Sequence, residues 1–511
     1  MTRARKKDPS AVDPPAARAG IPPASRSLHH IPEDTVALRL HNTLSGLAEE
    51  LVPGGVKKDS IADYPPVTIY SCGPTVYGYA HIGNFRTFTF NDLLRRYLKF
   101  RGYRVDHAMN ITDVDDKTIA GAARDGVSLS EYTERYTEIF FQDLATLNIE
   151  PVEHNPRATE SIDDMVDIIS RLEEKGIVYE KDGSLYFSIA KFESYGRLSR
   201  LDTREVKSGL RYDTDEYAKD DARDFALWKA PKEGEPYWET PFGKGRPGWH
   251  IECSAMVRRI FGGTIDIHTG GVDLIFPHHE NEIAQSEAAF GEPFARRWVH
   301  VEHLLVEGAK MSKSLGNFYT LRDLLEKGHL PRAIRYLLIS AHYRKQLNFT
   351  FEGLAQAESA LSRIDNLLLR LGEAQEGAPS GDKTDALIRE FMERFTADMD
   401  DDLNISGALG RLFEFIHEVN ALIDRGELSK ADADKVIDAL KKIDSVLGVI
   451  FFTPAGGQDV DAERIERLIE ERRESKKAKN FARADEIRAM LEAEGIVLED
   501  TRDGTRWKRK R

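Results

Sequence analysis

The chain of 511 residues contains only two cysteines, Cys72 and Cys253, and no long apolar run. Two cysteines in a chain of this length exclude a disulfide scaffold and are typical of a reducing compartment, so we expect a cytoplasmic protein. A membrane-spanning helix needs ~20 largely apolar residues in a row, so we expect no membrane association. A composition of 41% hydrophobic and 31% charged residues is typical of a globular protein, and the length predicts about three domains.

The chain is also short of net positive charge, because 72 basic residues stand against 86 acidic ones, a formal net charge of −14. A local patch matters more for nucleic-acid binding than this sum. Residues 501–511 hold six basic residues and one acidic residue, with Trp507 among them. Such a segment can neutralise phosphates and stack on bases, or it can be a solvated tail that aids solubility. Taken alone, the segment favours the solvated tail.

The first 109 residues contain one clear α/β unit. Residues 1–33 mix Pro, Ala, Arg and Lys without apolar periodicity, which predicts a disordered extension. A β-rich segment at 67–71 leads to a loop that ends in His-Ile-Gly-Asn, residues 81–84. An amphipathic helical pattern then ends near Gly102, and a second strand pattern covers 103–109. Strand, loop, helix and strand in this order open a nucleotide-binding α/β fold with a parallel sheet.

The rest of the chain divides by pattern into five further segments. We predict an α/β protein with a Rossmann-type sheet domain at 34–150 and 231–300, interrupted by an insertion at 151–230. A strand at 301–307 and a lysine-containing loop belong to a segment at 301–345. Long amphipathic helices, one of them at 402–423, predict a helical bundle at 346–455, with a loop at 372–384. A small α+β unit at 456–511 closes the chain.

Residues 247–282 are unusually rich in metal-binding side chains. If Pro277 begins a helix, His278 and Glu282 lie four residues apart on one helical face. Together with Cys253 and the distant Cys72 they form a donor set that suits zinc. Two cysteines far apart in sequence are also compatible with ordinary buried packing. The residues alone leave both interpretations open.

Three loops carry residues suited to a nucleotide. His81 and Asn84 lie where a strand passes into a helix, whose first amides can hold an anion. Lys310 and Lys313 in a serine-containing loop can neutralise phosphates, and Gly271 with Asp273 allows close backbone approach and a carboxylate for ribose. A helix cap, an exposed lysine turn and a glycine turn explain the same residues without a ligand.

Taken together, these motifs resemble those of a known enzyme family. His-Ile-Gly-Asn at 81–84 and Lys-Met-Ser-Lys-Ser at 310–314 resemble the signature pair of class I aminoacyl-tRNA synthetases. The segments Pro-Gly-Trp-His-Ile-Glu-Cys-Ser-Ala-Met and Asp-Leu-Ile-Phe-Pro-His-His-Glu-Asn-Glu narrow the resemblance to the cysteinyl-tRNA synthetases. The resemblance extends from about Asn42 to the C-terminus.

The resemblance implies a zinc ion held by Cys72, Cys253, His278 and Glu282, which binds the thiolate of the substrate cysteine. Since four protein ligands are typical of a closed site, we expect either a fifth ligand or a loosely held Glu282. The resemblance further assigns residues to the reaction and its substrates. Catalysis is assigned to His81, Asn84, Lys310 and Lys313; ATP binding to His81, Asn84, Gly271, Asp273 and Lys313; amino-acid binding to Thr112, Trp249 and His268, with His250 as a further candidate.

The implied reaction is the ATP-dependent activation of L-cysteine to cysteinyl-adenylate, followed by transfer to the terminal 2′-hydroxyl of tRNA(Cys), with Mg²⁺ accompanying ATP. Residues 346–455 would bind the anticodon stem and residues 456–511 the anticodon, in a chain expected to be a monomer. One departure is Asn84, where the family usually has a second histidine, although its amide can preserve a phosphate contact. A cysteine ligase that acts on an amino sugar and a non-catalytic relative that binds RNA or senses cysteine are the alternatives.

Overall fold

The structure is a computed structural model of the chain and describes residues 37–200, 224–377, 382–452, 462–477, 480–493, 496–501 and 504–509. The extension expected at 1–33 lies outside these residues. Among the described residues, no helix combines the length and apolar character needed to cross a bilayer.

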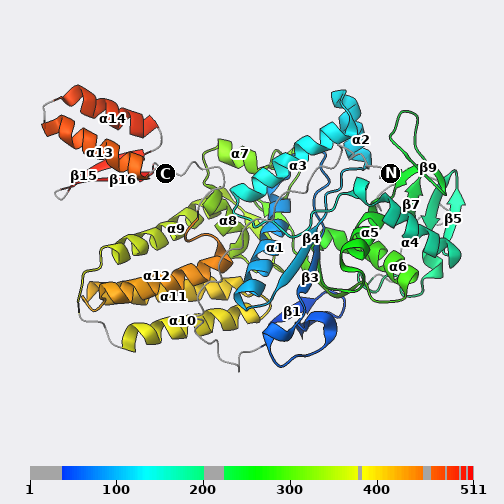
Figure 1. Cartoon of the computed structure of the whole chain (residues 1–511), viewed down its shortest axis with the longest axis horizontal. Coiled ribbons are helices and arrows are strands. Elements are labelled where there is room, and N and C mark those ends of the chain that lie inside the picture. The colour runs from blue at the N-terminus through cyan, green and yellow to red at the C-terminus, as the bar shows by residue number, and fades with distance from the viewer. Residues whose placement is uncertain are drawn as a thin grey trace, which may run out of the picture. The chain divides into compact units, whose positions relative to one another are not determined.

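Four parallel strands form one sheet in the order β11-β10-β3-β4, and β3 and β4 are labelled in Figure 1. The strands are β3 (Val67–Ser71), β4 (Val105–Met109), β10 (Ile265–Gly271) and β11 (Ala295–Val301). Two strands precede and two follow a long intervening segment, which confirms the predicted Rossmann-type sheet with an insertion. A hairpin that the sequence did not predict, β1 (Arg39–Asn42) and β2 (Leu47–Glu50), is tied to β11 by a bond from Thr43 N to Trp298 O of 2.8 Å.

The helix after β3 is built as the sequence predicts. Helix α1 (Ile82–Phe100) begins with His81 as its N-cap, whose side chain and that of Asn84 satisfy each other's backbone amides. Its apolar face is buried, and the residue after Arg101, Gly102, has a positive φ that ends the helix. Helices α2 (Asp116–Asp125) and α3 (Leu129–Thr146) follow β4.

The segment between the two halves of the sheet carries a five-stranded antiparallel sheet of its own. The sheet order is β5-β6-β7-β9-β8. Its elements are β5 (Val178–Lys181), β6 (Ser184–Phe187), β7 (Phe225–Lys229), β8 (Trp238–Thr240) and β9 (Gly243–Pro247), with α4 (Ile162–Glu174) before them and α5 (Trp249–Phe261) after them. Helix α6 (Glu280–Phe290) comes later, between β10 and β11. Strands β8 and β9 extend this sheet beyond residue 230, and the predicted domain boundaries stay predictions.

The sequence predicted a single strand at 301–307, and these bounds were wrong. Backbone pairing divides the segment, because β11 ends at Val301 and the short β12 (Leu304–Val306) joins another sheet with β13 (Ala309–Lys310) and β14 (Leu347–Phe349). Helices α7 (Leu321–Glu326) and α8 (Pro331–Ser340) lie between β13 and β14. A strand pattern alone does not say which neighbour a strand will pair with, so the break at residues 302–303 was not visible in the sequence.

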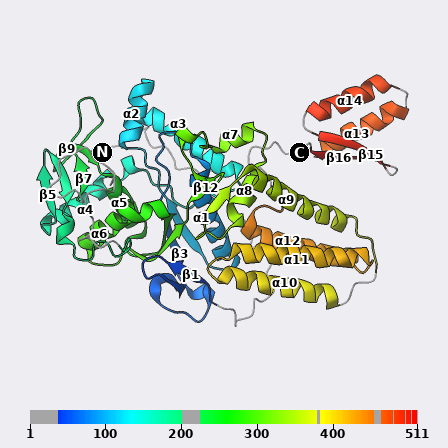
Figure 2. The same ribbon diagram turned by 180° about the vertical axis from the view of Figure 1, so that it is seen from behind.

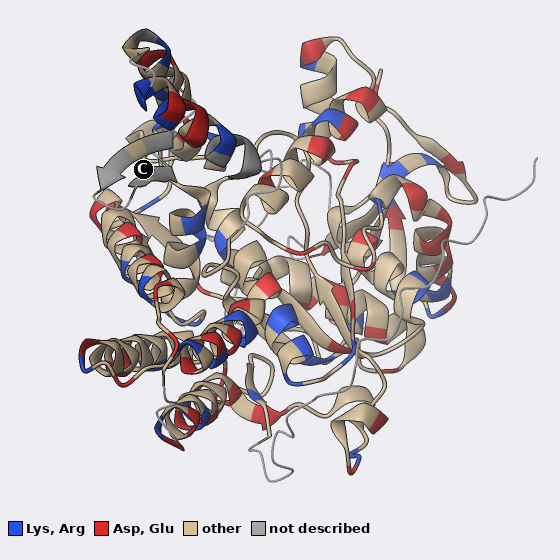
Figure 3. Ribbon diagram, turned by 60° about the vertical axis from the view of Figure 1, so that its left-hand side comes forward, with Lys and Arg blue, Asp and Glu red and all other residues tan. Residues whose placement is uncertain are grey.

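A bundle of long helices follows (Figures 1 and 2), as predicted. The helices are α9 (Phe351–Gly372), α10 (Asp382–Asp400), α11 (Ile405–Asp424) and α12 (Lys430–Leu447). A fully buried ion pair joins the bundle to α1: Arg335 Nη2 lies 2.6 Å from Asp92 Oδ2, and Arg335 Nε donates to Leu447 O at 2.9 Å. Along the helices, Lys and Arg are interspersed with Asp and Glu (Figure 3).

The C-terminal unit has its own small core, which includes Ile469, Ile487, Leu491 and Leu498. Its elements are α13 (Ala462–Lys477), α14 (Phe481–Ala493), β15 (Ile496–Thr501) and β16 (Gly504–Arg509). Strand β16 pairs antiparallel with β15, so the basic segment is an ordered strand over residues 504–509 and not a free tail there.

Candidate active site and metal centre

Four polar side chains from four elements converge in the interior of the molecule. Cys72 follows β3, Cys253 lies in α5, His278 lies in a π-helical turn (Ile275–His279), and Glu282 lies in the first turn of α6. All four are buried, and each offers one potential ligand atom within 4.8 Å of the others. The structure therefore brings together the four residues to which the resemblance assigns a metal.

The contacts within this cluster are close. His278 Nε2 lies 2.8 Å from Glu282 Oε1 and 3.6 Å from Cys253 Sγ, and Cys72 Sγ lies 3.8 Å from Glu282 Oε1. His278 and Glu282 are the i, i+4 pair predicted from the sequence. The regular α-helix begins only at Glu280, because the preceding segment is a π-helical turn (Ile275–His279) in which Phe276 has extended φ and ψ.

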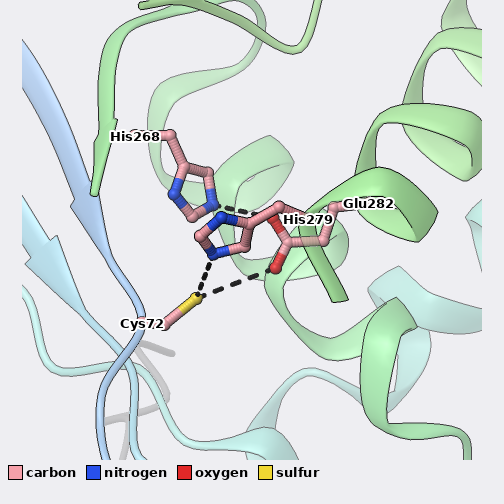
Figure 4. Close-up of side chains that lie close together, drawn as sticks. All are labelled: Cys72, His268, His279 and Glu282. Atoms are coloured by element: carbon pink, nitrogen blue, oxygen red, sulfur yellow. Dashed lines mark hydrogen bonds and ion pairs between the residues drawn. The ribbon is translucent and has the colours of Figure 1, made fainter. Parts of the chain in front are cut away.

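Sequence reasoning missed a second donor set that shares two members with the first (Figure 4). Cys72, His268, His279 and Glu282 also offer atoms within 4.8 Å of one another. His279 Nε2 lies 3.3 Å from Cys72 Sγ, and His268 Nε2 lies 2.7 Å from Glu282 Oε2. Only helical spacing gave a signal for His279, which lies three residues before Glu282.

Charge is distributed unevenly over the cluster. Burial raises the pKa of the Cys72 thiol to about 11 and that of Cys253 well above its usual value. Burial also opposes the charge of Glu282, but the facing histidines hold its pKa well below the usual range. Burial opposes the charge of His278 as well, yet Glu282 raises the pKa of that imidazole to about 10. Both thiols are therefore protonated at neutral pH unless a cation displaces their protons.

The residues predicted for the amino-acid pocket surround this cluster. The Trp249 ring stacks on His278 with centroids 4.3 Å apart, and His250 Nδ1 lies 2.9 Å from His278 Nδ1. The Thr112 hydroxyl donates to Glu252 Oε2 at 2.8 Å, so it is satisfied from within the protein. His268 is fully buried, stacks on Trp298 with centroids 4.5 Å apart, and has its Nε2 2.7 Å from Glu282 Oε2.

The two phosphate loops, more than two hundred residues apart in the sequence, lie against each other. Ile82 N donates to Tyr319 O at 3.0 Å, and the rings of His81 and Phe318 meet edge to face with centroids 5.3 Å apart. Gly83 leaves room for the Met311 side chain, since a Cβ there would lie 2.7 Å from Met311 Cε. The start of α1 and the lysine loop therefore form one surface.

That surface is far more open than the metal cluster. Asn84, Asp273 and Lys310 are exposed, and Lys310 lies in the short strand β13. Burial lowers the pKa of His81, and the nearby carboxylate of Asp273 opposes that change. Gly271 ends β10 beside these groups. The backbone of Lys313 lies in a short 3-10 turn (Lys313–Leu315), and its side chain lies outside the described part of the structure.

The donor set fits a zinc ion on chemical grounds. Two thiols, an imidazole and a carboxylate are ligands that zinc binds in proteins, and all four are withdrawn from water. His278 Nδ1 lies 2.9 Å from His250 Nδ1, and His279 Nδ1 lies 2.8 Å from His300 Nε2, as ligand histidines commonly contact a further polar group. The assignment of individual ligands stays a prediction, because two overlapping donor sets are present.

Two models of known protein families match most of the chain. Residues 60–359 match the family model described as tRNA synthetases class I (C) catalytic domain. Residues 394–452 match the DALR domain.

Two curated relatives match the chain over nearly its whole length. The cysteine–tRNA ligase of Leptospira interrogans is 50% identical over 484 residues, which cover 93% of this chain and 100% of that protein. The cysteine–tRNA ligase of Solibacter usitatus is 50% identical over 479 residues, with the same coverage of both chains.

Solved structures support the fold. Mycobacterium tuberculosis methionyl-tRNA synthetase in complex with methionyl-adenylate matches with a TM-score of 0.57 and 16% identity, covering 75% of this chain and 91% of that one. A likeness at this identity concerns the fold alone.

Proposed function

The chain belongs to the cysteine–tRNA ligase family of class I aminoacyl-tRNA synthetases, and on that premise we propose that its buried Cys/His/Glu cluster holds one zinc ion that selects cysteine. Enzymes of this family use ATP to join an amino acid to tRNA. The observation that carries the proposal is the convergence of Cys72, Cys253, His278 and Glu282 within 4.8 Å, all buried.

A zinc ion bound there supplies a soft acceptor for the substrate's thiolate sulfur, an interaction that serine and alanine cannot make. A site that depends on an interaction absent from the competitor discriminates far better than one that measures a methylene. The protein would contribute to this selection by orienting the carboxylate of Glu282. His268 Nε2 lies 2.7 Å from one carboxylate oxygen of Glu282, and the other oxygen faces Cys72 and His278.

The open surface beside the cluster would bind ATP with Mg²⁺. In the first step the cysteine carboxylate attacks the α-phosphate, a bond forms to that phosphorus, and pyrophosphate leaves. Lys310 and Lys313 would balance the charge that develops on the phosphates, while His81 and Asn84 hold the phosphates at the start of α1. Gly271 and Asp273 would face the ribose.

In the second step the terminal 2′-hydroxyl of tRNA attacks the activated carbonyl, and AMP leaves. Neither step needs a side-chain nucleophile, so catalysis would depend on positioning and on charge stabilisation. Helices α9–α12 would lie along the anticodon stem, and the unit at 462–509 would meet the anticodon. The expected monomeric state and cytoplasmic location stay predictions.

The test compares Cys253→Ser with Ala255→Ser, which places the same residue at a fully buried position of the same helix. We expect Cys253→Ser to lose zinc affinity at least ~100-fold, because a lost ligand exceeds the 10–100-fold effect of outer partners. The Michaelis constant for cysteine in ATP–pyrophosphate exchange should rise with it. Zinc content is read by mass spectrometry of the purified protein.

Ala255→Ser should keep its zinc and its preference for cysteine over serine. If Cys253→Ser kept both as well, the ligand assignment would be wrong. If the unaltered, zinc-loaded chain showed no cysteine-dependent exchange, the proposed reaction itself would be wrong.

A further inference from the structure

Two exposed tyrosines stand beside the start of α1. Tyr77 and Tyr79 lie in the loop between β3 and α1 and are 46% and 50% exposed. Both are large rings, and neither belongs to the phosphate loops or to the metal cluster. Single exposed rings are common on a protein surface, but two of them close together in one loop form a patch that a ligand can cover.

A cation lies over the face of each ring. Lys117 Nζ lies 5.1 Å from the centroid of Tyr77, and Arg322 Cζ lies 5.5 Å from that of Tyr79. Tyr136 meets Tyr79 edge to face, with centroids 5.8 Å apart and an interplanar angle of 84°. Three elements beside this loop (α2, α3 and α7) therefore contribute to one aromatic and basic surface.

Hydrogen bonds from neighbouring elements hold the loop that carries Tyr77 and Tyr79. The buried Tyr132 donates its hydroxyl to Tyr77 O at 2.8 Å, and Val76 N donates to Thr112 O at 3.2 Å. Gly121 makes room for the Tyr132 ring, because a Cβ at that position would overlap it. A surface that is ordered before binding loses little conformational entropy when a ligand arrives.

Acidic side chains neutralise part of the positive charge on this surface. Arg135 lies over Tyr136 at 5.0 Å and also pairs with Asp125 at 2.8 Å, and Arg322 pairs with Asp143 at 3.1 Å. Neighbouring acids therefore balance part of the positive charge. A ligand that binds mainly by ring stacking suits this balance better than one held by several phosphates.

The position of the rings points to the ligand. Tyr79 lies two residues before His81, the N-cap of α1, which pairs with Thr320 through a backbone bridge. In the proposed reaction the terminal ribose of tRNA must reach the adenylate at this place. The nucleotides that carry that ribose are unpaired, and an unpaired base exposes its face for stacking on an aromatic side chain.

We propose that Tyr77 and Tyr79 form a stacking platform for the unpaired 3′ nucleotides of tRNA. The platform sits at the mouth of the adenylate site and orients the terminal ribose toward it, with Lys117 and Arg322 as flanking cations. This inference rests on the proposed function, since it needs a tRNA substrate. The platform takes part in the transfer step and not in adenylate formation.

The test measures tRNA binding and ATP–pyrophosphate exchange for Tyr79→Ala in the full chain. Stacking contributes about 1–3 kcal/mol per base, so the dissociation constant for tRNA should rise about 5–150-fold. Exchange should stay within twofold of the unaltered chain. Tyr79→Phe keeps a ring and should bind tRNA nearly as well as Tyr79. The matched control is Phe141→Ala on α3, an aromatic ring that is 37% exposed and lies outside the platform.

A second tRNA that lacks the unpaired 3′ nucleotides allows a double-mutant cycle between Tyr79 and those nucleotides. Tyr79→Ala should bind this shortened tRNA as tightly as the unaltered chain does, because the stacked bases are already gone. An equal loss for both tRNAs, or no loss for either, would overturn the platform. Reduced exchange in Tyr79→Ala would also overturn it, since the ring would then support the ATP loop. Absence of exchange in the unaltered chain would instead refute the proposed function.

Discussion

The metal cluster and the phosphate surface lie side by side, yet they are built in opposite ways. In the cluster, Cys72, Cys253, His278 and Glu282 are fully buried, and several of their polar atoms contact one another. On the phosphate surface, Asn84, Asp273 and Lys310 are exposed, and the backbone holds the loops in place. Side-chain packing therefore fixes the geometry of the metal cluster, whereas the groups of the phosphate surface lie exposed at the ends of helices and strands.

This difference has an electrostatic consequence. A charge in the cluster acts at low dielectric, where the pKa values of Glu282 and His278 shift strongly in opposite directions. The exposed charges on the phosphate surface are screened by water. A change in the cluster should alter stability and substrate choice, whereas a change on the surface should alter mainly the rate.

The largest effect should come from Glu282→Gln in protein stripped of metal. The change leaves His278 without its buried counter-charge, and removing one partner of a buried pair costs about 3–5 kcal/mol. We expect the apparent melting temperature of a chain of this length to fall by about 3–5 °C, as calorimetry would show. The matched surface change, Asp273→Asn, should leave it unaltered. If Glu282→Gln and Asp273→Asn had equal melting temperatures, the cluster would not contribute more to stability than the phosphate surface does.

A smaller effect, on rate alone, is expected for Lys310→Ala. A missing cation at the transferring phosphoryl group slows such reactions about 100-fold. The turnover number of ATP–pyrophosphate exchange should fall accordingly, with zinc content and melting temperature unchanged. Lys345→Ala removes another exposed lysine and serves as the control. Loss of zinc from Lys310→Ala would show that the two sites are not built independently.

The smallest effect should come from Asn84. Its Oδ1 accepts a bond of 3.1 Å from His81 N and completes the cap of α1. Asn84→Ala should lower stability by about 0.5–1 kcal/mol, measured by denaturant unfolding. Asn84→Asp keeps the acceptor, so stability should survive while exchange slows, because a carboxylate would face the phosphates. If Asn84→Asp left exchange unchanged, Asn84 would be a helix cap and nothing more.

Several elements followed from the sequence because their signals are local. The strand predicted at 67–71 is Val67–Ser71, and the helix predicted to end near Gly102 ends at Phe100. The helix predicted at 402–423 is Ile405–Asp424. Apolar periodicity and capping residues determine such elements within a few residues of sequence. Long motifs identified the family for the same reason, since each is a continuous stretch.

Other features depended on contacts between distant residues. His279 reaches Cys72 only because the residue after β3 meets the turn before α6, and no pattern near His279 distinguishes it from His278. The strand expected at 301–307 is divided by its pairing partners, and β8 and β9 extend the inserted sheet past residue 230. The surface around Tyr79 was equally hidden, because Lys117, Tyr136 and Arg322 come from three separate helices.

The sequence by itself determined which chemistry this protein carries, because thiols, imidazoles, a carboxylate and two lysine-bearing motifs stand in continuous segments with a recognisable order. The tertiary structure decided which of these groups act together. Burial and the packing of β3 against α5 and α6 place two overlapping donor sets around Cys72 and Glu282. They also leave Tyr77 and Tyr79 uncovered beside the start of α1. Distances between side chains that are far apart in the chain arise only when the chain folds, and for this reason no local pattern contains them.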